Sequence, residues 1–406
     1  MVITNQGVRI VFENNQTCYT PQEELFTRIE RLQGHLLTAG MQAALIVQNA
    51  DLFYFSGTCQ DAHLLIPARG EPLLMVRKNY ERALEESALD KIIAVQSYKD
   101  IGRSIAGSLK NRGGIGLELD VLPANLFFRY KKMLEPLEII DVSGAIREIR
   151  MIKSPYEIEC MKECIRVTSE MYNEVPNLLK EGMTEIELSS RLELLMRVKG
   201  NQGNPRLRAF NQEAPPHVLS GRNSAYPSFF DGPTGGAGLS PAFPQGPGFK
   251  TIGRNEPILV DFSAVINGYV VDHTRIFSIG PLSDKLVEAH NTALEIKRRF
   301  IQEIKPGANG KDFYDMAVNM AEKAGLSSHF MGSGVHFVGH GLGLELDELP
   351  VIAKNHHVTL QSGMVLALEP KFVFPGEGTV GVEDTFVLTE SGLEQLNMLD
   401  DSIKIL

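Results

Sequence analysis

The chain has 406 residues, of which 43% are hydrophobic and 22% charged, so it can bury a large core and is expected to form two domains. Its formal net charge is −10 and no Lys/Arg cluster is visible, which excludes nucleic acids and anionic membranes as charge-driven partners. No basic segment followed by an apolar core opens the chain, and no window of about 18 apolar residues occurs. We therefore expect a globular cytoplasmic protein.

Residues 1–150 alternate helical patterns with short apolar runs. The segment 20–23, TPQE, predicts a capping box with Pro21 at the first helical position, and this helix is expected to end near Gly40. Short apolar runs follow, as is typical of buried strands. These features predict an α/β domain.

A second helical region begins close to residue 152. The segment 154–157, SPYE, is a capping box that opens a long amphipathic helix running to about Gly182. The segment 184–187, TEIE, opens a further helix that Gly200 ends. The predicted domains are residues 1–152 and residues 153–406.

Residues 228–250, SFFDGPTGGAGLSPAFPQGPGFK, are too rich in Gly and Pro for a helix or a central strand. A loop of this length in a compact domain is more often functional or mobile than accidental. It could close off a substrate cleft, leave it open, or act as a lid. The lid hypothesis predicts that truncating the loop lowers turnover.

The clearest chemical signal is a β-hairpin at residues 257–280, with Asn267-Gly268 as its turn. A two-residue turn places Asp261 diagonally across from Asp272, and a four-residue loop places them directly opposite. Either way, the two carboxylates share one face, about 5 to 8 Å apart. The flanking residues are apolar, so we expect this face to be buried around a metal ion, and a solvated face is the alternative.

A second carboxylate pair lies within residues 364–389. Glu369 ends an apolar run, and Glu383 and Asp384 stand on the strand that returns after a Pro-Gly turn. Even-numbered loops place Glu369 opposite Asp384. Glu369 and Glu383 therefore share a face only if the loop is odd or if a bulge forms, for which Pro370 is a plausible position.

A histidine between two glycines, His340, completes the candidate site. Alone it is more typical of a hydrogen-bonded loop histidine. Together with Asp261, Asp272, Glu369 and Glu383 it forms a set whose four negative charges balance two divalent cations. Such oxygen-rich ligation suits Mn²⁺, which we favour, or Co²⁺, Fe²⁺ or Zn²⁺. Two such ions about 3.5 to 4 Å apart activate water and polarise a carbonyl, which indicates a hydrolase.

This ordered set resembles the pita-bread metallopeptidases, the family of Xaa-Pro dipeptidase (prolidase), aminopeptidase P, methionine aminopeptidase and creatinase. The family's ligands match VDFSAVINGYVVDHTR, GHGLGLE, LEP and VEDT. Residues 20–150 resemble the creatinase/prolidase N-terminal domain, so nearly the whole chain is covered. The resemblance implies an N-terminal α/β domain, a catalytic domain with a curved antiparallel sheet flanked by helices, a homodimer, and a small peptide or amide as substrate.

The resemblance also implies how the ligands divide between two metal ions. Asp272 and Glu383 would bridge the ions, Asp261 would complete one, and His340 and Glu369 would complete the other. A water that bridges the ions would be the nucleophile, with Glu369 as its general base.

Two further residues receive roles from the resemblance. His336 would stabilise the tetrahedral oxyanion, because it matches the family's histidine beside the scissile bond. Thr274 would not bind a metal ion itself but would orient a carboxylate that does.

Three positions depart from the family pattern. Ser228 and Asp347 stand where the family has histidines, and Gly381 stands where it has an arginine. These positions serve substrate binding and proton transfer in Xaa-Pro enzymes, so the departures bear on specificity. Asp347 favours a cationic group, such as a free amine or an amidino group, over a carboxylate. His217 could replace the histidine missing at Ser228, or be an ordinary surface histidine.

Three functional hypotheses follow. The leading one is a dinuclear metal-dependent peptidase of the Xaa-Pro aminopeptidase or dipeptidase type. The second is a metal-dependent C–N hydrolase of small molecules, related to creatinase or ectoine hydrolase, which the three departures favour. The third is a non-catalytic binding protein on the same fold, against which the complete ligand set counts.

Overall fold

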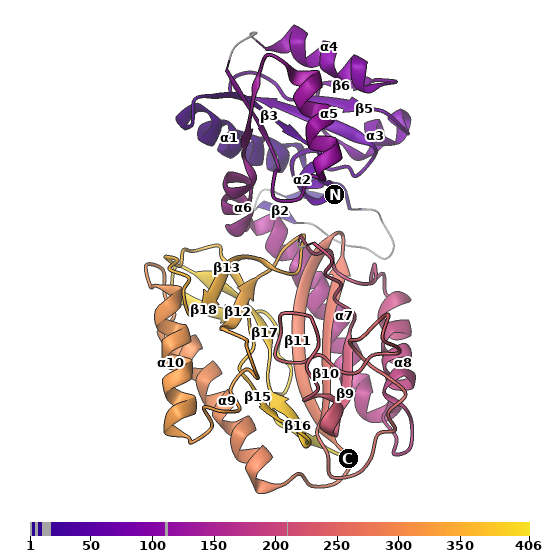
Figure 1. The fold of residues 1–406 in the computed structure, drawn as a ribbon, viewed down its shortest axis with the longest axis vertical. Helices are drawn as coiled ribbons and strands as arrows, with labels where there is room; N and C mark the ends of the chain where they lie inside the picture. The colour runs from indigo at the N-terminus through magenta and orange to yellow at the C-terminus, as the bar shows by residue number, and fades with distance from the viewer. Residues whose placement is uncertain (1, 5–6, 10–17, 110–112, 209) are drawn as a thin grey trace. The chain divides into compact units, whose positions relative to one another are not determined.

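The computed structural model describes residues 2–4, 7–9, 18–109, 113–208 and 210–406. The chain divides into two units, Met1–Arg150 and Met151–Leu406, each with helices and strands (Figure 1). The predicted mixed α/β class is confirmed. Among the described residues, no helix is long and apolar enough to cross a membrane.

A six-stranded mixed sheet forms the centre of the first unit. Its strands are β3 (Met41–Ile46), β4 (Ala62–Pro67), β5 (Leu73–Val76), β6 (Ile92–Ala94), β7 (Gly114–Leu117) and β8 (Glu138–Asp141). They lie in the order β6-β5-β4-β3-β7-β8, with β3 antiparallel to β4 and parallel to β7. Apolar side chains from the sheet, such as Leu45 and Ile115, pack with those of the helices into one core. Two short strands, β1 (Val2–Thr4) and β2 (Gly7–Arg9), pair separately.

The helices of the first unit connect these strands. They are α1 (Gln22–Thr38), α2 (Asn49–Ser56), α3 (Tyr80–Glu86), α4 (Tyr98–Ser108), α5 (Ala124–Leu134) and α6 (Ser143–Met151). The capping box predicted at residues 20–23 is wrong: Pro21 is the N-cap, its ψ of 147° is extended, and no side chain caps the helix. The predicted end near Gly40 is confirmed, since α1 ends at Thr38 and Gly40 has a φ of 69°.

The second unit contains two larger antiparallel systems of strands. The first consists of β9 (His217–Ser220), β10 (Ile258–Ile266) and β11 (Tyr269–Ser278), with the short parallel β19 (Lys404–Ile405) at its edge. The second consists of β12 (Phe337–Gly341), β13 (Glu348–Ala353), β14 (Val365–Leu368), β17 (Asp384–Thr389) and β18 (Gly392–Gln395). A hairpin of β15 (Lys371–Phe374) and β16 (Gly378–Gly381) lies between β14 and β17 in the sequence (Figure 1).

Four helices flank these strands. They are α7 (Pro155–Leu178), α8 (Glu185–Arg197), α9 (Asp284–Glu303) and α10 (Gly310–Lys323). Figure 1 shows α7 and α8 beside β9 to β11, and α9 and α10 on the other side, beside β12, β13, β15 and β16. The capping boxes predicted at Ser154 and Thr184 are both confirmed. An isolated antiparallel bridge between Thr274 of β11 and Glu383 joins the two strand systems at their edges, and the helices flank them.

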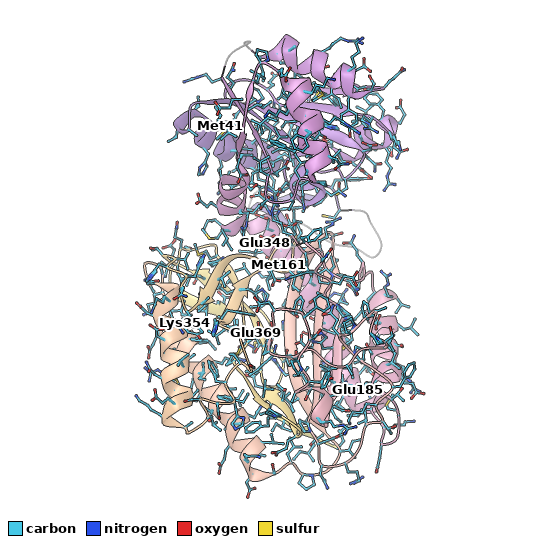
Figure 2. The ribbon with its side chains drawn as sticks, viewed as in Figure 1. Met41, Met161, Glu185, Glu348, Lys354 and Glu369 are labelled. Carbon is cyan, nitrogen blue, oxygen red and sulfur yellow. The ribbon has the colours of Figure 1, made fainter. Side chains whose placement is uncertain are left out.

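The Gly/Pro-rich segment 228–250 contains neither helix nor regular strand, as predicted. It is nevertheless tied to the rest of the unit. Buried Glu185, at the start of α8, accepts hydrogen bonds from the backbone N–H groups of Ser220 (2.6 Å) and Gly248 (3.2 Å) (Figure 2). A short 3-10 turn, η1 (Gly221–Asn223), precedes the segment. Glu185 therefore ties the C-terminal end of the segment, at Gly248, to α8 and to Ser220 of β9.

Candidate metal centre

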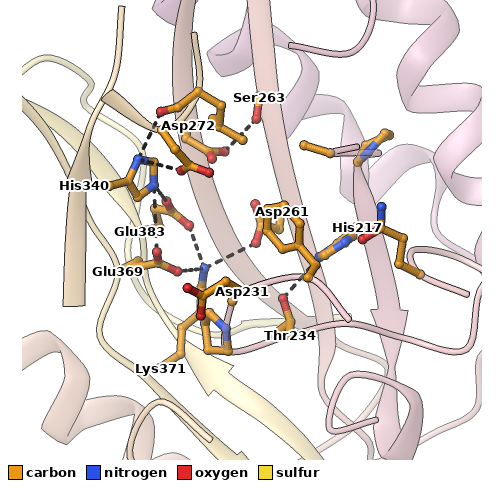
Figure 3. Close-up of a pocket in the computed structure, with 18 of the residues that line it drawn as sticks. His217, Asp231, Thr234, Asp261, Ser263, Asp272, His340, Glu369, Lys371 and Glu383 are labelled. Carbon is orange, nitrogen blue, oxygen red and sulfur yellow. Dashed lines mark hydrogen bonds and ion pairs between the residues drawn. The ribbon is translucent and has the colours of Figure 1, made fainter. Parts of the chain in front are cut away.

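The hairpin β10–β11 brings Asp261 and Asp272 to one face. Its turn is the two-residue Asn267-Gly268, and both residues have positive φ, 53° and 85°. Ser263 consequently lies opposite Asp272, and Asp261 is the diagonal neighbour of Asp272. Of the two predicted registers, the two-residue turn is the one that forms. Both carboxylates line the same pocket (Figure 3).

The second carboxylate pair meets because the loop of hairpin β15–β16 is odd. Phe374 pairs with Gly378, which leaves a three-residue loop. The pairing of Leu368 with Asp384 keeps the same register, so Glu369 stands opposite Glu383 without a net bulge at Pro370. Of the two predicted solutions, the odd loop is therefore the one that forms.

His340 on β12 presents one ring nitrogen to the carboxylates. Its Nδ1 lies 3.1 Å from the carbonyl oxygens of Gly341 and Leu346. Carbonyl oxygens only accept, so in the neutral ring the proton sits on Nδ1 and Nε2 keeps its lone pair. Nε2 lies 3.8 Å from Oε1 of Glu369 and 3.8 Å from Oε1 of Glu383. This tautomer is the one that a histidine needs to bind a metal ion through Nε2.

Asp272, His340 and Glu383 fit a cation. One ligand atom of each lies within 4.8 Å of the others, and all three residues are buried. Hydroxyl groups hold two of these carboxylates: Ser263 donates to Asp272 (3.2 Å) and Thr274 donates to Glu383 (2.9 Å). A buried group of two carboxylates and one imidazole requires a positive charge for balance, and a divalent ion supplies it.

The ammonium group of Lys371, a residue that was not predicted for the site, also enters it. Its Nζ donates to Oε2 of Glu383 (2.6 Å) and to Oε2 of Glu369 (2.8 Å), and lies 3.3 Å from Oδ2 of Asp261 (Figure 3). The side chain is only 1% exposed. The signal for it was in the sequence: a strand alternates its side chains, so the residue two positions after Glu369 shares its face. Three of the five predicted ligands, Asp261, Glu369 and Glu383, therefore contact an ammonium group.

Three of the four predicted carboxylate ligands hold their protons unusually strongly. Burial raises the pKa of Asp261 to about 6 and that of Glu369 to about 7, although Lys371 opposes both shifts. Burial, Glu383 and Asp261 raise the pKa of Asp272 well above its usual range. Burial also acts on Glu383, but Lys371 and His340 outweigh it and lower its pKa. The negative charge is thus only partly compensated by the side chains.

The pKa of His340 is also shifted. Burial disfavours the charged ring, but hydrogen bonding to Glu383 and the charges of Asp347 and Glu369 outweigh it, so the pKa is raised well above its usual value. In this state a proton on Nε2 lies where a cation would bind. Metal binding would displace that proton, since a coordinating imidazole must be neutral.

The three candidate substrate residues differ in where they lie. His217 lines the pocket beside Asp261, its strand partner, and its Nδ1 lies 3.2 Å from Oγ1 of Thr234. Asp347 lines the pocket with its side chain 46% exposed, 3.5 Å from Nδ1 of His340. Ser228 does not line the pocket, because its hydroxyl donates to the carbonyl of Pro244 within the Gly/Pro-rich segment. The suggested substrate role of Ser228 stays a prediction.

His336 also lies away from the pocket. It is exposed, and Phe337 rather than His336 stands beside His340, with ring centroids 6.4 Å apart. A register shift between Phe337 and Gly339 interrupts the two-residue alternation that would put residues 336 and 340 on one face. The predicted oxyanion role of His336 is not supported by this position.

Gly381 leaves no space for the arginine that the family pattern expects. Gly381 pairs with Lys371 across the hairpin and has a φ of 152°. A Cβ atom at this position would lie 2.4 Å from the carbonyl oxygen of Pro370 and 3.0 Å from Cγ of Lys371. The cationic side chain of this hairpin is therefore on β15 and not on β16.

Comparison with known proteins places this geometry in a family. Residues 159–390 match the description Metallopeptidase family M24, and residues 28–152 match Creatinase/Prolidase N-terminal domain. The first match spans more than half of the chain. The chain belongs to metallopeptidase family M24. The M24 match includes all five predicted ligand positions, and members of this family use divalent metal ions.

Several relatives of this M24 chain are similar over their full lengths. A curated Xaa-Pro dipeptidase of Pyrococcus furiosus is 27% identical over 371 residues, 91% of this chain and 97% of the relative. The solved Xaa-Pro dipeptidase from Bacillus anthracis is 26% identical with a TM-score of 0.82, covering 94% and 100% of the two chains. The X-Pro aminopeptidase from Thermotoga maritima is 28% identical with a TM-score of 0.77, covering 93% and 99%. The predicted pita-bread catalytic fold is confirmed by these neighbours.

Proposed function

We propose that this M24 chain is a metal-dependent hydrolase that cleaves the amide bond of Xaa-Pro dipeptides or short Xaa-Pro peptides. The observation that carries the proposal is the buried group of Asp272, His340 and Glu383 in a pocket of about 60 Å³. The relatives named Xaa-Pro dipeptidase and X-Pro aminopeptidase support the substrate class.

The donor set fits one divalent ion, held by Asp272, His340 and Glu383, with Oε1 of Glu369 facing the same position. When bound, such an ion supplies Lewis-acid polarisation of the scissile carbonyl and promotes the ionisation of water. The predicted second ion is not part of this proposal, because the oxygens that would bind it already contact Lys371.

Glu369 is the proposed general base. In the metal-free protein burial raises the pKa of its carboxylate to about 7, so this carboxylate is a stronger base than an exposed glutamate. Its Oε1 faces His340, and its Oε2 accepts a hydrogen bond from Lys371, which holds the carboxylate in place. Glu369 would remove a proton from the attacking water at Oε1 and return it to the leaving amine. Thr274 orients Glu383 for metal binding.

The pocket has room for only a small group beside the carboxylates. A volume of about 60 Å³ corresponds to roughly four water molecules. Phe230, Pro233 and Thr234 from the Gly/Pro-rich segment form one wall, and Phe337 contributes another side chain. This wall supports the proposal that the segment limits substrate length, and it favours small substrates over long peptides.

A second candidate function is favoured by the acidic side chains of the pocket. Asp231 and Asp347 line it, and both are exposed, so a substrate that carries an amine or amidino group would be attracted. A small-molecule C–N hydrolase would use the same metal, base and pocket. Asp347→His is expected to raise KM for cationic substrates roughly 2- to 5-fold, because a half-exposed charge is screened.

The matched control for that variant is Asp315→Asn on α10, which does not line the pocket. Its KM values should stay at the wild-type level. If Asp347→His left the preference for cationic over anionic substrates unchanged, the proposed role of Asp347 would be wrong.

The proposed function is tested with purified protein reconstituted with Mn²⁺, beside a chelated sample. The panel contains Xaa-Pro dipeptides, Xaa-Pro tripeptides, non-proline dipeptides and cationic C–N substrates, with products identified by mass spectrometry. Chelator-sensitive cleavage of Xaa-Pro bonds is the expected result, and the ratio of dipeptide to tripeptide cleavage separates a dipeptidase from an aminopeptidase. Cleavage of the cationic substrates alone would favour the second candidate. Metal binding without any turnover would favour a binding protein.

A homodimer and the two-domain organisation, 1–152 and 153–406, complete the proposal. The match of residues 28–152 to the Creatinase/Prolidase N-terminal domain supports the boundary. Sedimentation velocity on the full chain tests the dimer: a single species of twice the chain mass is expected, and a monomer at micromolar concentration would contradict it.

A further inference from the structure

The acidic site has two halves that share two glutamates. Oε1 of Glu369 and Oε1 of Glu383 face Nε2 of His340, at 3.8 Å each. The other oxygens of the same glutamates, Oε2 in both cases, accept hydrogen bonds from Nζ of Lys371. One half contains His340 and Asp272, and the other half contains Lys371 and Asp261. Each half therefore has its own potential positive charge (Figure 3).

An ammonium group and a divalent ion cannot share the half that contains Lys371. A first-row divalent ion binds carboxylate oxygens at about 2.0 to 2.2 Å. Nζ already lies 2.6 Å and 2.8 Å from the two glutamate oxygens and 3.3 Å from Asp261. An ion bound to the same three oxygens would therefore overlap Nζ or repel it at very short range. These three oxygens can therefore bind either a second divalent ion or the ammonium group, but not both.

The rest of the structure holds Lys371 in place. Its backbone pairs with Gly381 on β16, and its carbonyl accepts a hydrogen bond from the backbone N–H of Met331 (2.9 Å). Gly381 has no Cβ, and a Cβ there would lie 3.0 Å from Cγ of Lys371, so the glycine leaves the space that the lysine stem fills. The side chain is 1% exposed, so moving the ammonium away from its three carboxylates would leave a buried charge unpaired.

We propose that Lys371 is a built-in cation that occupies one half of the acidic site, so that the site binds one divalent ion, at Asp272, His340 and Glu383, instead of two. This inference rests on the proposed metal-dependent function and deepens it. Lys371 fixes the orientation of Glu369 and Glu383 through their Oε2 atoms and leaves their Oε1 atoms for the ion. It is a positioning residue, because its contacts are to the carboxylates of the site.

The test is the number of metal ions bound per chain. Full-length protein is stripped with chelator, saturated with Mn²⁺, passed through a desalting column and analysed by mass spectrometry for manganese. The expected count is one for the wild type and two for Lys371→Ala, which removes both the charge and the stem. Electron paramagnetic resonance gives a second readout: an isolated Mn²⁺ in the wild type and a spin-coupled pair in Lys371→Ala.

The matched control is Lys250→Ala. Lys250 also pairs with a carboxylate of the second unit, Glu256 (2.7 Å), but it does not line the pocket. Its metal count should remain one. Circular dichroism of each variant shows whether it folds, and if Lys371→Ala does not fold, the count and spectrum of the wild type still decide the question.

Three results would overturn the inference: two ions in the wild type, none in the wild type, or only one in folded Lys371→Ala. The metal count does not depend on turnover, so this inference and the peptidase proposal can fail separately. A count of one with no cleavage of any substrate would remove the peptidase proposal and keep this inference. A count of two with chelator-sensitive cleavage would remove this inference and keep the peptidase proposal.

Discussion

Two adjacent residues, Glu383 and Asp384, enter two different buried charge clusters. Glu383 faces the pocket, where it contacts Lys371 and Thr274. Asp384 begins β17 and points to the other side, where it pairs with Arg275 (2.7 Å) and Lys297. The alternation of side chains along an extended chain separates them. Two neighbouring residues thus contribute to the pocket and to a separate buried ion-pair cluster beside it.

The two clusters differ in their charge balance. Around Asp384, two carboxylates (Asp384 and Asp401) meet two cations (Arg275 and Lys297), and Arg275 and Lys297 lower the pKa of Asp384 although burial opposes them. Among the five predicted ligands and Lys371, four carboxylates meet one ammonium and one imidazole, and three of the four have raised pKa values. A balanced cluster is complete without a ligand. The unbalanced cluster needs a further cation, and this difference separates a structural ion-pair network from a metal site.

The largest expected effect is the loss of activity in Glu383→Gln. We expect kcat/KM to fall by about 10³-fold or more, because the substitution removes a metal ligand. The melting temperature should change little, since Lys371 retains Asp261 and Glu369 as partners. Peptide hydrolysis and thermal unfolding measure the two effects. Retention of activity within about 10-fold of the wild type would remove Glu383 from the proposed metal site.

Asp384→Asn should produce the opposite pattern. It leaves Arg275 and Lys297 with Asp401 as their remaining carboxylate, and we expect the free energy of unfolding to fall by about 3–5 kcal/mol. The kcat/KM of the folded fraction should stay close to that of the wild type. Urea unfolding measures the loss, and a change below about 1 kcal/mol would show that this cluster does not support the fold.

The pocket carboxylates should also make the metal-free protein less stable as the pH rises. The pKa of Asp261 is about 6 and that of Glu369 about 7, above the values of roughly 4 in an unfolded chain. The folded state therefore keeps protons that the unfolded chain has lost, and this contribution to stability disappears as the pH rises through the folded values. From about pH 5 to about pH 8, we expect a loss of roughly 1–3 kcal/mol.

Urea unfolding in chelator at both pH values measures this loss. Mn²⁺ should reduce it, because the ion stabilises the ionised carboxylates, and Glu369→Gln should reduce it in the absence of metal. A stability that is independent of pH, or a loss that Mn²⁺ leaves unchanged, would contradict the proposed charge deficit.

The smallest expected effect concerns the two histidines four residues apart. His336→Ala should change kcat/KM by less than about 3-fold, because the side chain is exposed and outside the pocket. His340→Ala, the matched variant, should lower it by more than about 100-fold through loss of the metal ligand. A loss of about 30-fold or more in His336→Ala would return this residue to the catalytic machinery.

Local rules predicted much of the fold around the site. The Asn267-Gly268 turn fixed the register of β10 and β11, so the shared face of Asp261 and Asp272 followed from the period of two along a strand. The capping boxes at Ser154 and Thr184 gave the starts of α7 and α8. For Glu369 and Glu383, the same period narrowed the choice to an odd loop or a bulge, and only the structure distinguished them.

The remaining features depended on irregular backbone and on distant neighbours. The register shifts in β12 fall at Gly339 and Gly341, where glycine is typical of a bulge, but a glycine alone does not say that His336 turns away from the pocket. The hydroxyl of Ser228 turned to Pro244, a contact that depends on the path of the Gly/Pro-rich segment. Lys371 shares a face with Glu369 by the period of a strand, but its contact with Asp261, 110 residues away, is a property of the tertiary structure.

The most direct test of the metal-dependent site is to titrate metal-free protein with Mn²⁺ and measure kcat/KM for an Xaa-Pro dipeptide at each step. The site of Asp272, His340 and Glu383 predicts that activity is absent without metal, rises linearly, and reaches its plateau at one equivalent per chain. Activity that is unaffected by chelation would contradict the metal-dependent function, and a plateau at two equivalents would contradict the role of Lys371.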